Sequence, residues 1–107
     1  MIRDLYAKLP KEAPEYLAFV RSLPSAASGM IGCVAHHRIG GRLSQHKVSD
    51  FDTMPLTDEE HRELHAGMAA FVEKYGKTEA DMVKATLLEA IRLGVLKFDA
   101  RAARELA

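Results

Sequence analysis

The chain has 107 residues, of which 48% are hydrophobic and 28% charged, and its 15 basic and 15 acidic side chains give a formal net charge of zero. This size and composition predict one globular domain over residues 1–107, and a neutral charge argues against a protein that coats nucleic acid without specificity. The single cysteine, Cys33, excludes an internal disulfide and any multi-cysteine zinc site within one chain.

The N-terminal part predicts two short amphipathic helices. Apolar residues recur at i, i+3, i+4 and i+7 in residues 2–9 and again in residues 16–23. Pro10 ends the first helix, and Pro14 and Pro24 bound the second. Both apolar stripes are expected to face the core.

Residues 24–56 change character. The small residues of 25–32 predict turns, and "CVAHH" at 33–37 predicts a short strand. A polar, glycine-containing loop follows. "FDTMPL" at 51–56 predicts a second extended segment, since Pro55 disfavours helix at Met54.

Two helices are predicted after this second segment. Thr57 and Glu60 form a capping box that starts a helix expected to run to about Tyr75 and to end at Gly76. A second capping arrangement at Thr78 starts a helix that ends near Gly94, and residues 97–107 form a short exposed helix or a frayed tail. The expected class is therefore α+β and mostly helical.

Four of the five histidines fall in two pairs. His61 and His65 are four residues apart on a predicted helix, so one face can present both imidazoles to a metal ion, although this spacing alone is common. His36 and His37 are adjacent on a predicted strand and must point to opposite faces. One can bind the ion while the other takes a proton from water, a division suited to phosphodiester hydrolysis.

The segments "AHH" and "DTMPLTDEEHRELH" together resemble the HNH motif of the ββα-metal nuclease superfamily. Over about residues 15–95 the chain is similar to small HNH-type endonucleases of phages and prophages, which are related to the phage recombination-enhancement nuclease. The resemblance implies a ββα core, a short two-stranded hairpin plus a helix, surrounded by additional helices.

The resemblance also implies a role for each matching residue. His36, His61 and His65 would bind one divalent ion, and His37 would be the general base. Asp52 stands at the position of the motif's asparagine, whose side chain holds the catalytic strand, and Asp50 is a neighbouring candidate. The ion would be magnesium or manganese in function, and a purified sample could carry zinc or nickel.

Two departures from the family pattern stand out. An ionised aspartate cannot donate a hydrogen bond as asparagine does. The cysteines with which many relatives bind a structural zinc are replaced by residues 25–28, so packing must hold this segment, or it is loose. Cys33 is expected to be a buried, small apolar residue.

One loop is locally basic. Between Val34 and Val48 the chain has Arg38, Arg42 and Lys47 and no acidic residue, so these three are candidate phosphate contacts, with Arg62 a weaker one. The loop histidine, His46, is expected to be exposed. A solvated basic loop explains the same charges.

The expected partners are DNA, a bacterial recombinase or other phage recombination proteins, and a second copy of the chain. No apolar run approaches the roughly 18 residues of a membrane span, and the N-terminal residues do not resemble a signal peptide, so we expect a cytoplasmic protein. Two alternatives to the nuclease remain open: a zinc-stabilised module that binds DNA or a partner without cutting, and a plain helical domain with incidental histidines.

Overall fold

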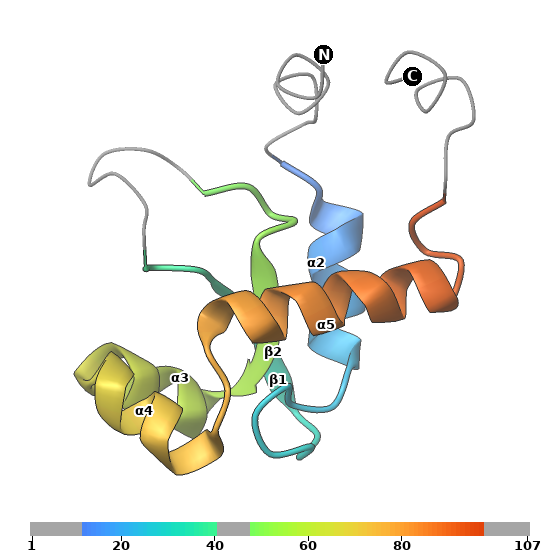
Figure 1. The fold of residues 1–107 in the computed structure, drawn as a ribbon. Coiled ribbons are helices and arrows are strands. Elements are labelled where there is room, and N and C mark those ends of the chain that lie inside the picture. The colour runs from blue at the N-terminus through green and yellow to red at the C-terminus, as the bar shows by residue number, and fades with distance from the viewer. Residues whose placement is uncertain (1–11, 41–47, 98–107) are drawn as a thin grey trace.

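The computed structural model describes residues 12–40 and 48–97. Its elements follow one another in the order given in Figure 1: α2 (Pro14–Ser22), β1 (Cys33–His37), β2 (Thr53–Thr57), α3 (Asp58–Ala66), α4 (Met68–Tyr75) and α5 (Glu79–Arg92). This confirms the expected α+β class with a two-stranded hairpin and a helical majority. The helix predicted over residues 2–9 and the tail over 98–107 lie outside the described residues.

The hairpin formed by β1 and β2 is antiparallel and lies at the centre of the molecule (Figure 1). Cys33 pairs with Thr57 at one end and His37 with Thr53 at the other. The second strand therefore begins two residues later than the extended segment predicted from Phe51. At the free edge of β2, the amide of Ala26 donates to the carbonyl of Pro55 at 2.9 Å, so the preceding loop is attached to the hairpin.

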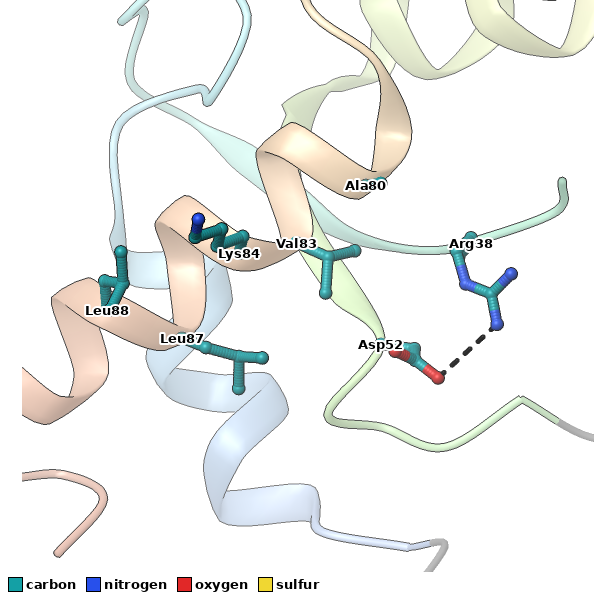
Figure 2. Close-up of a pocket in the computed structure, with 7 residues that line it drawn as sticks. All are labelled: Arg38, Asp52, Ala80, Val83, Lys84, Leu87 and Leu88. Atoms are coloured by element: carbon teal, nitrogen blue, oxygen red, sulfur yellow. Dashed lines mark ion pairs between the residues drawn. The ribbon is translucent and has the colours of Figure 1, made fainter. Parts of the chain in front are cut away.

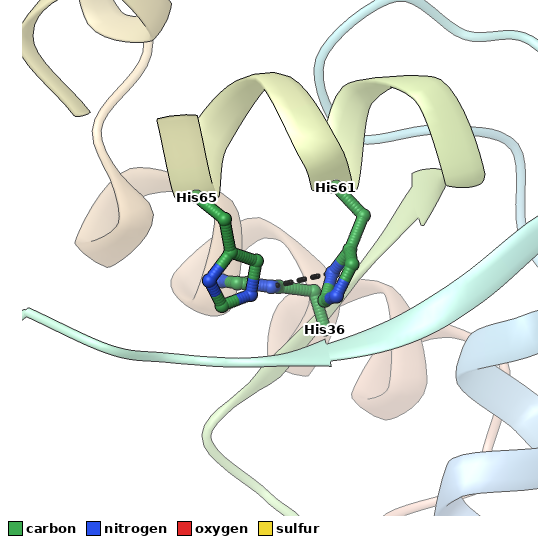
Figure 3. A group of neighbouring side chains, drawn as sticks. All are labelled: His36, His61 and His65. Atoms are coloured by element: carbon green, nitrogen blue, oxygen red, sulfur yellow. Dashed lines mark hydrogen bonds between the residues drawn. The ribbon is translucent and has the colours of Figure 1, made fainter. Parts of the chain in front are cut away.

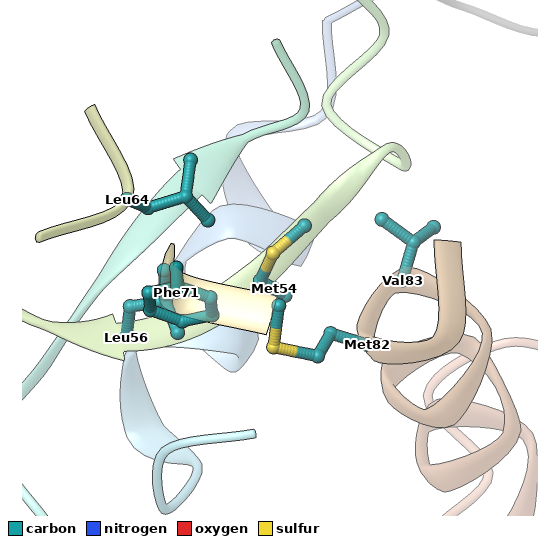
Figure 4. Packing of buried hydrophobic residues seen from close by; sticks show 6 residues of the cluster. All are labelled: Met54, Leu56, Leu64, Phe71, Met82 and Val83. Carbon is teal, nitrogen blue, oxygen red and sulfur yellow. The ribbon is translucent and has the colours of Figure 1, made fainter. Parts of the chain in front are cut away.

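The main core joins β2 to all three C-terminal helices (Figure 4). Its buried members come from β2, α3, α4 and α5: Met54, Leu56, Leu64, Phe71, Met82 and Val83. A second cluster of Tyr16, Val20 and Ala90 packs α2 against α5, with Ala35 of β1 at its border. Because helices pack on both faces of the hairpin, neighbouring β1 side chains enter different environments.

The helix predicted from Asp58 to Tyr75 is in fact two helices, and that prediction was wrong. Gly67 adopts an extended conformation, with φ −173° and ψ 107°, and separates α3 from α4. The bend turns α4 back along α3, and this brings the end of α4 to Glu63. Lys74 and Tyr75 both donate to its carboxylate at 2.8 Å. The bend also buries Phe71, which is 2% exposed, in the main core.

The longest described helix, α5, has 14 residues. Within residues 12–40 and 48–97, no helix has both the length and the hydrophobicity needed to cross a membrane.

Candidate metal centre

Three of the four paired histidines meet between β1 and α3 (Figure 3). His61 and His65 project from one face of α3, as their spacing predicts, toward His36 on the strand. Each ring offers a nitrogen, and the three nitrogens lie within 4.8 Å of one another. The structure thus brings together the three residues predicted as ligands.

The three rings meet edge to face, with centroids 4.5–5.5 Å apart. The shortest contact joins Nδ1 of His36 to Nδ1 of His61 at 2.9 Å. Imidazole nitrogens suit zinc, copper, iron and nickel. Three of them at this spacing therefore fit one metal ion.

Burial favours the neutral form that metal ligation requires. The pKa of His36 is lowered by desolvation, which its hydrogen bond to Glu79 only partly offsets. The pKa of His61 is lowered by desolvation and by nearby His65. His36 is fully buried whereas His65 is exposed, so the cluster runs from the interior to the surface and stays accessible to solvent.

A buried carboxylate that sequence reasoning missed supports the cluster. Oε2 of Glu79, the first residue of α5, lies 2.8 Å from Nε2 of His36 and accepts from the amide of Ile39 at 3.0 Å. Oε1 accepts from the amide of Gly40 at 2.8 Å. Burial tends to raise the pKa of Glu79, but these hydrogen bonds lower it overall. An acid in the first turn of a helix is ordinary, so the sequence held no specific signal for this role.

His37 lies outside the three-histidine cluster. Its side chain is 34% exposed, and Nε2 lies 2.7 Å from Oδ1 of Asp50. The other oxygen of Asp50 accepts from the amide of Ala13 at 2.7 Å, just before α2. The two adjacent histidines thus face different sides of β1 and meet different carboxylates, and the catalytic role of His37 stays a prediction.

Asp52, predicted to hold the catalytic strand with its side chain, makes a different side-chain contact. Its carboxylate lies 3.7 Å from the guanidinium of Arg38, while the contact to His37 comes from Asp50. The hydrogen bond of Asp52 across the hairpin comes from its backbone carbonyl, which accepts from the amide of Arg38 at 3.0 Å. One residue, Phe51, separates Asp50 from Asp52, and the turn at 50–51 places only Asp50 beside His37.

Arg38 and Asp52 lie at one end of a groove of about 490 Å³ whose other wall is α5 (Figure 2). Lys84 of α5 also lines this groove, which therefore carries two basic groups. The other predicted phosphate contacts, Arg42 and Lys47, lie outside the described residues, as does His46.

Hydrogen bonds hold residues 25–28, the segment in which the resemblance led us to expect either packing or a loose conformation. The buried hydroxyl of Ser25 donates to Glu60 at 2.6 Å and accepts from the amides of Ala27 and Ser28. Glu60 at the same time completes the capping box with Thr57 that was predicted to start α3. Cys33 is a free, buried thiol, as expected, and burial raises its pKa.

Comparison with known proteins gives a family match over most of the chain. Residues 5–94 match the family model described as "Protein of unknown function (DUF968)". The chain is 33% identical over 100 residues to "Uncharacterized protein YdfU" of Escherichia coli (strain K12), covering 87% of this chain but 28% of the length of that relative. No solved structure matches the chain. Because the family model spans well over half of the sequence, the protein belongs to the family described as "Protein of unknown function (DUF968)".

Proposed function

We propose that this chain is a metal-dependent HNH-type endonuclease domain that hydrolyses DNA phosphodiester bonds. The observation that carries the proposal is the convergence of His36, His61 and His65 on a hairpin strand and the helix that follows the hairpin. This combination of donor set and supporting elements is the one implied by the resemblance to the HNH motif.

The three histidines would hold one divalent ion. Bound there, the ion supplies positive charge that stabilises the phosphate and the oxygen that leaves. We propose magnesium or manganese as the functional ion, whereas zinc or nickel would bind an all-imidazole set more tightly and could accompany the purified protein. Among the described residues the cluster holds three ligands, which leaves a coordination position for substrate.

His37 would take the proton from the attacking water. Asp50 can only accept a hydrogen bond when ionised, so its contact with Nε2 favours the ring tautomer that carries its proton there. The lone pair is then on Nδ1, which has no hydrogen-bond partner among the described residues. Asp50, itself held by the amide of Ala13, would orient the base in the way a carboxylate orients a catalytic histidine elsewhere.

Arg38 follows His37 directly and would contact the phosphate, together with the predicted contacts Arg42 and Lys47. Lys84 adds a second basic group to the groove that Arg38 lines. A domain with zero net charge nevertheless has little non-specific affinity for DNA. We therefore propose that a partner, either a recombinase filament or a second copy of the chain, holds the substrate in place.

The runner-up function is a zinc-stabilised module that binds DNA or a protein without cutting. Its support is the complete burial of His36, which makes the cluster a structural link between β1 and α3. A closed zinc site normally has four protein ligands, and the described residues supply three. The cluster is one ligand short of a closed site, and it is open to solvent at His65, where a substrate could reach the ion. Both features favour the nuclease.

Plasmid nicking separates the two functions. With magnesium or manganese, wild-type protein should convert supercoiled plasmid to the open circle. His37→Ala should lose about 10²-fold or more of this rate, the usual contribution of a general base, while retaining its bound metal by elemental analysis. Arg21→Ala, an exposed change on α2, is the matched control and should cut at the wild-type rate.

Two results would contradict the nuclease. Equal nicking by wild type and His37→Ala would remove His37 from the reaction. Metal-loaded wild-type protein that cuts no DNA with any divalent ion, alone or on recombinase filaments, would favour the binding module.

A further inference from the structure

We propose that Glu79 is a positioning residue for the metal centre, holding His36 in the tautomer protonated at Nε2 so that Nδ1 is the metal ligand. This inference rests on the metal site of the proposed function, but it concerns the protein without metal as well. It assigns a role to a residue that lies 43 positions from His36 in the chain.

The two nitrogens of His36 face different groups. Nε2 lies 2.8 Å from Oε2 of Glu79, and an ionised carboxylate can only accept, so Nε2 must carry the proton. A neutral ring then has its lone pair on Nδ1. That nitrogen lies 2.9 Å from Nδ1 of His61, on the side where the three histidines converge. The contact with Glu79 thus leaves a free lone pair on Nδ1, the nitrogen that faces the other two histidines.

Glu79 is itself held firmly. The side chain is 6% exposed, and its two oxygens accept from the amides of Ile39 and Gly40 in addition to the histidine. A Cβ added to Gly40 would lie 3.0 Å from Oε1, so glycine at this position allows the close approach. Both carboxylate oxygens therefore face N–H groups and act as acceptors, which is the form in which Glu79 orients the ring of His36.

The arrangement also adds negative charge behind a ligand. A carboxylate that accepts from a ligating histidine fixes the ring and raises its basicity, and its loss typically costs 10–100-fold in metal affinity. Because Glu79 begins α5, this helix is coupled to an ion otherwise held by β1 and α3. The site is therefore assembled from three elements rather than two.

The first test measures the tautomer in the metal-free wild-type protein. Two-bond proton–nitrogen correlation spectra distinguish a ring protonated at Nε2 from one protonated at Nδ1. At a pH where His36 is neutral, we expect the Nε2–H form. An Nδ1–H form would overturn the inference, and this measurement does not depend on the folding of any variant.

The second test is calorimetric titration with nickel or zinc. Glu79→Gln should weaken binding by about 10–100-fold, since the amide removes the charge and would turn an NH₂ group toward one of the backbone amides. Glu89→Gln removes a partly exposed carboxylate, which pairs with Arg92, from the same helix and should bind as wild type. Circular dichroism confirms that both variants are folded. Unchanged affinity in Glu79→Gln would overturn the role.

The outcomes separate this inference from the nuclease. Metal-loaded protein that cuts no DNA, but shows the Nε2–H tautomer and the affinity loss, overturns only the nuclease. Wild-type protein that binds none of these ions overturns both. Cutting by wild type together with an Nδ1–H tautomer overturns the role of Glu79 and leaves the nuclease intact.

Discussion

Two adjacent residues, His36 and His37, have different environments because strand side chains alternate between faces. The first is fully buried against Glu79, and the second is one-third exposed against Asp50. The alternation was predictable from the sequence, whereas the division of labour between the two rings stays a prediction. The two carboxylates were not, because each reaches its histidine only through tertiary packing.

Removal of the Tyr16 hydroxyl group is expected to stabilise the protein. Tyr16 is 3% exposed, and its hydroxyl has no hydrogen-bond partner among the described residues. An unsatisfied buried hydroxyl costs about 1–3 kcal/mol, so Tyr16→Phe should raise the free energy of unfolding by about 1 kcal/mol at neutral pH. Chemical denaturation measures this difference.

The same residue predicts a pH dependence. Burial raises the pKa of Tyr16 to about 12, so the folded state resists ionisation more strongly than the unfolded state. Wild type should therefore lose stability relative to Tyr16→Phe as the pH rises from about 10, the ordinary tyrosine value, to about 12. A stability difference that stays constant over this range would contradict the buried, un-ionised hydroxyl.

Among the elements, α4 has a glycine at each end, and the two glycines have different backbone conformations. Gly67 has an extended backbone that any residue can adopt, whereas Gly76 ends α4 with a φ of 70°. Only the second lies in the left-handed region that favours glycine. The break at Gly67 therefore reflects the packing of Phe71 and the contacts of Glu63 rather than a conformation that requires glycine.

A pair of alanine substitutions tests this distinction. Gly76→Ala should lower the free energy of unfolding by about 1–2 kcal/mol, the cost of a left-handed alanine. Gly67→Ala should change it by less than about 0.5 kcal/mol, since the added Cβ meets only Ala70, at 3.8 Å. Urea denaturation of both variants decides the matter. An equal loss at both positions would show that the helix break itself needs glycine.

At the scale of the whole molecule, the proposed metal centre connects parts that are distant in the chain. His36 is on β1, His61 and His65 are on α3, and Glu79 begins α5. An unfolded chain cannot hold these groups together, so an ion that binds the folded state must stabilise it.

Metal addition should therefore raise the melting temperature. At a free nickel or zinc concentration about 100 times the dissociation constant, folding gains about 2.7 kcal/mol, which corresponds to roughly 10 °C or more for a domain of this size. His61→Ala should remove most of the shift, and Arg62→Ala, its exposed neighbour on α3, should retain it. Differential scanning calorimetry measures both. An equal shift in the two variants would place the bound ion elsewhere.

The sequence by itself determined the features that depend on near neighbours. Capping residues marked the starts of α3 and α5, β1 was predicted with its observed bounds, and helical spacing put His61 and His65 on one face. The predicted ligand set came from spacing together with the family resemblance. The chain folds locally by these rules because a helix turn or a strand repeat involves only a few residues.

Only the tertiary structure decided which side chains complete the site. Glu79 meets His36 across 43 positions, and Asp50, rather than Asp52, meets His37 across the hairpin. The bend at Gly67 likewise follows from core packing, not from local preference. Such contacts depend on how helices and strands pack against one another, and a single sequence carries no periodic signal for a pairing between distant positions.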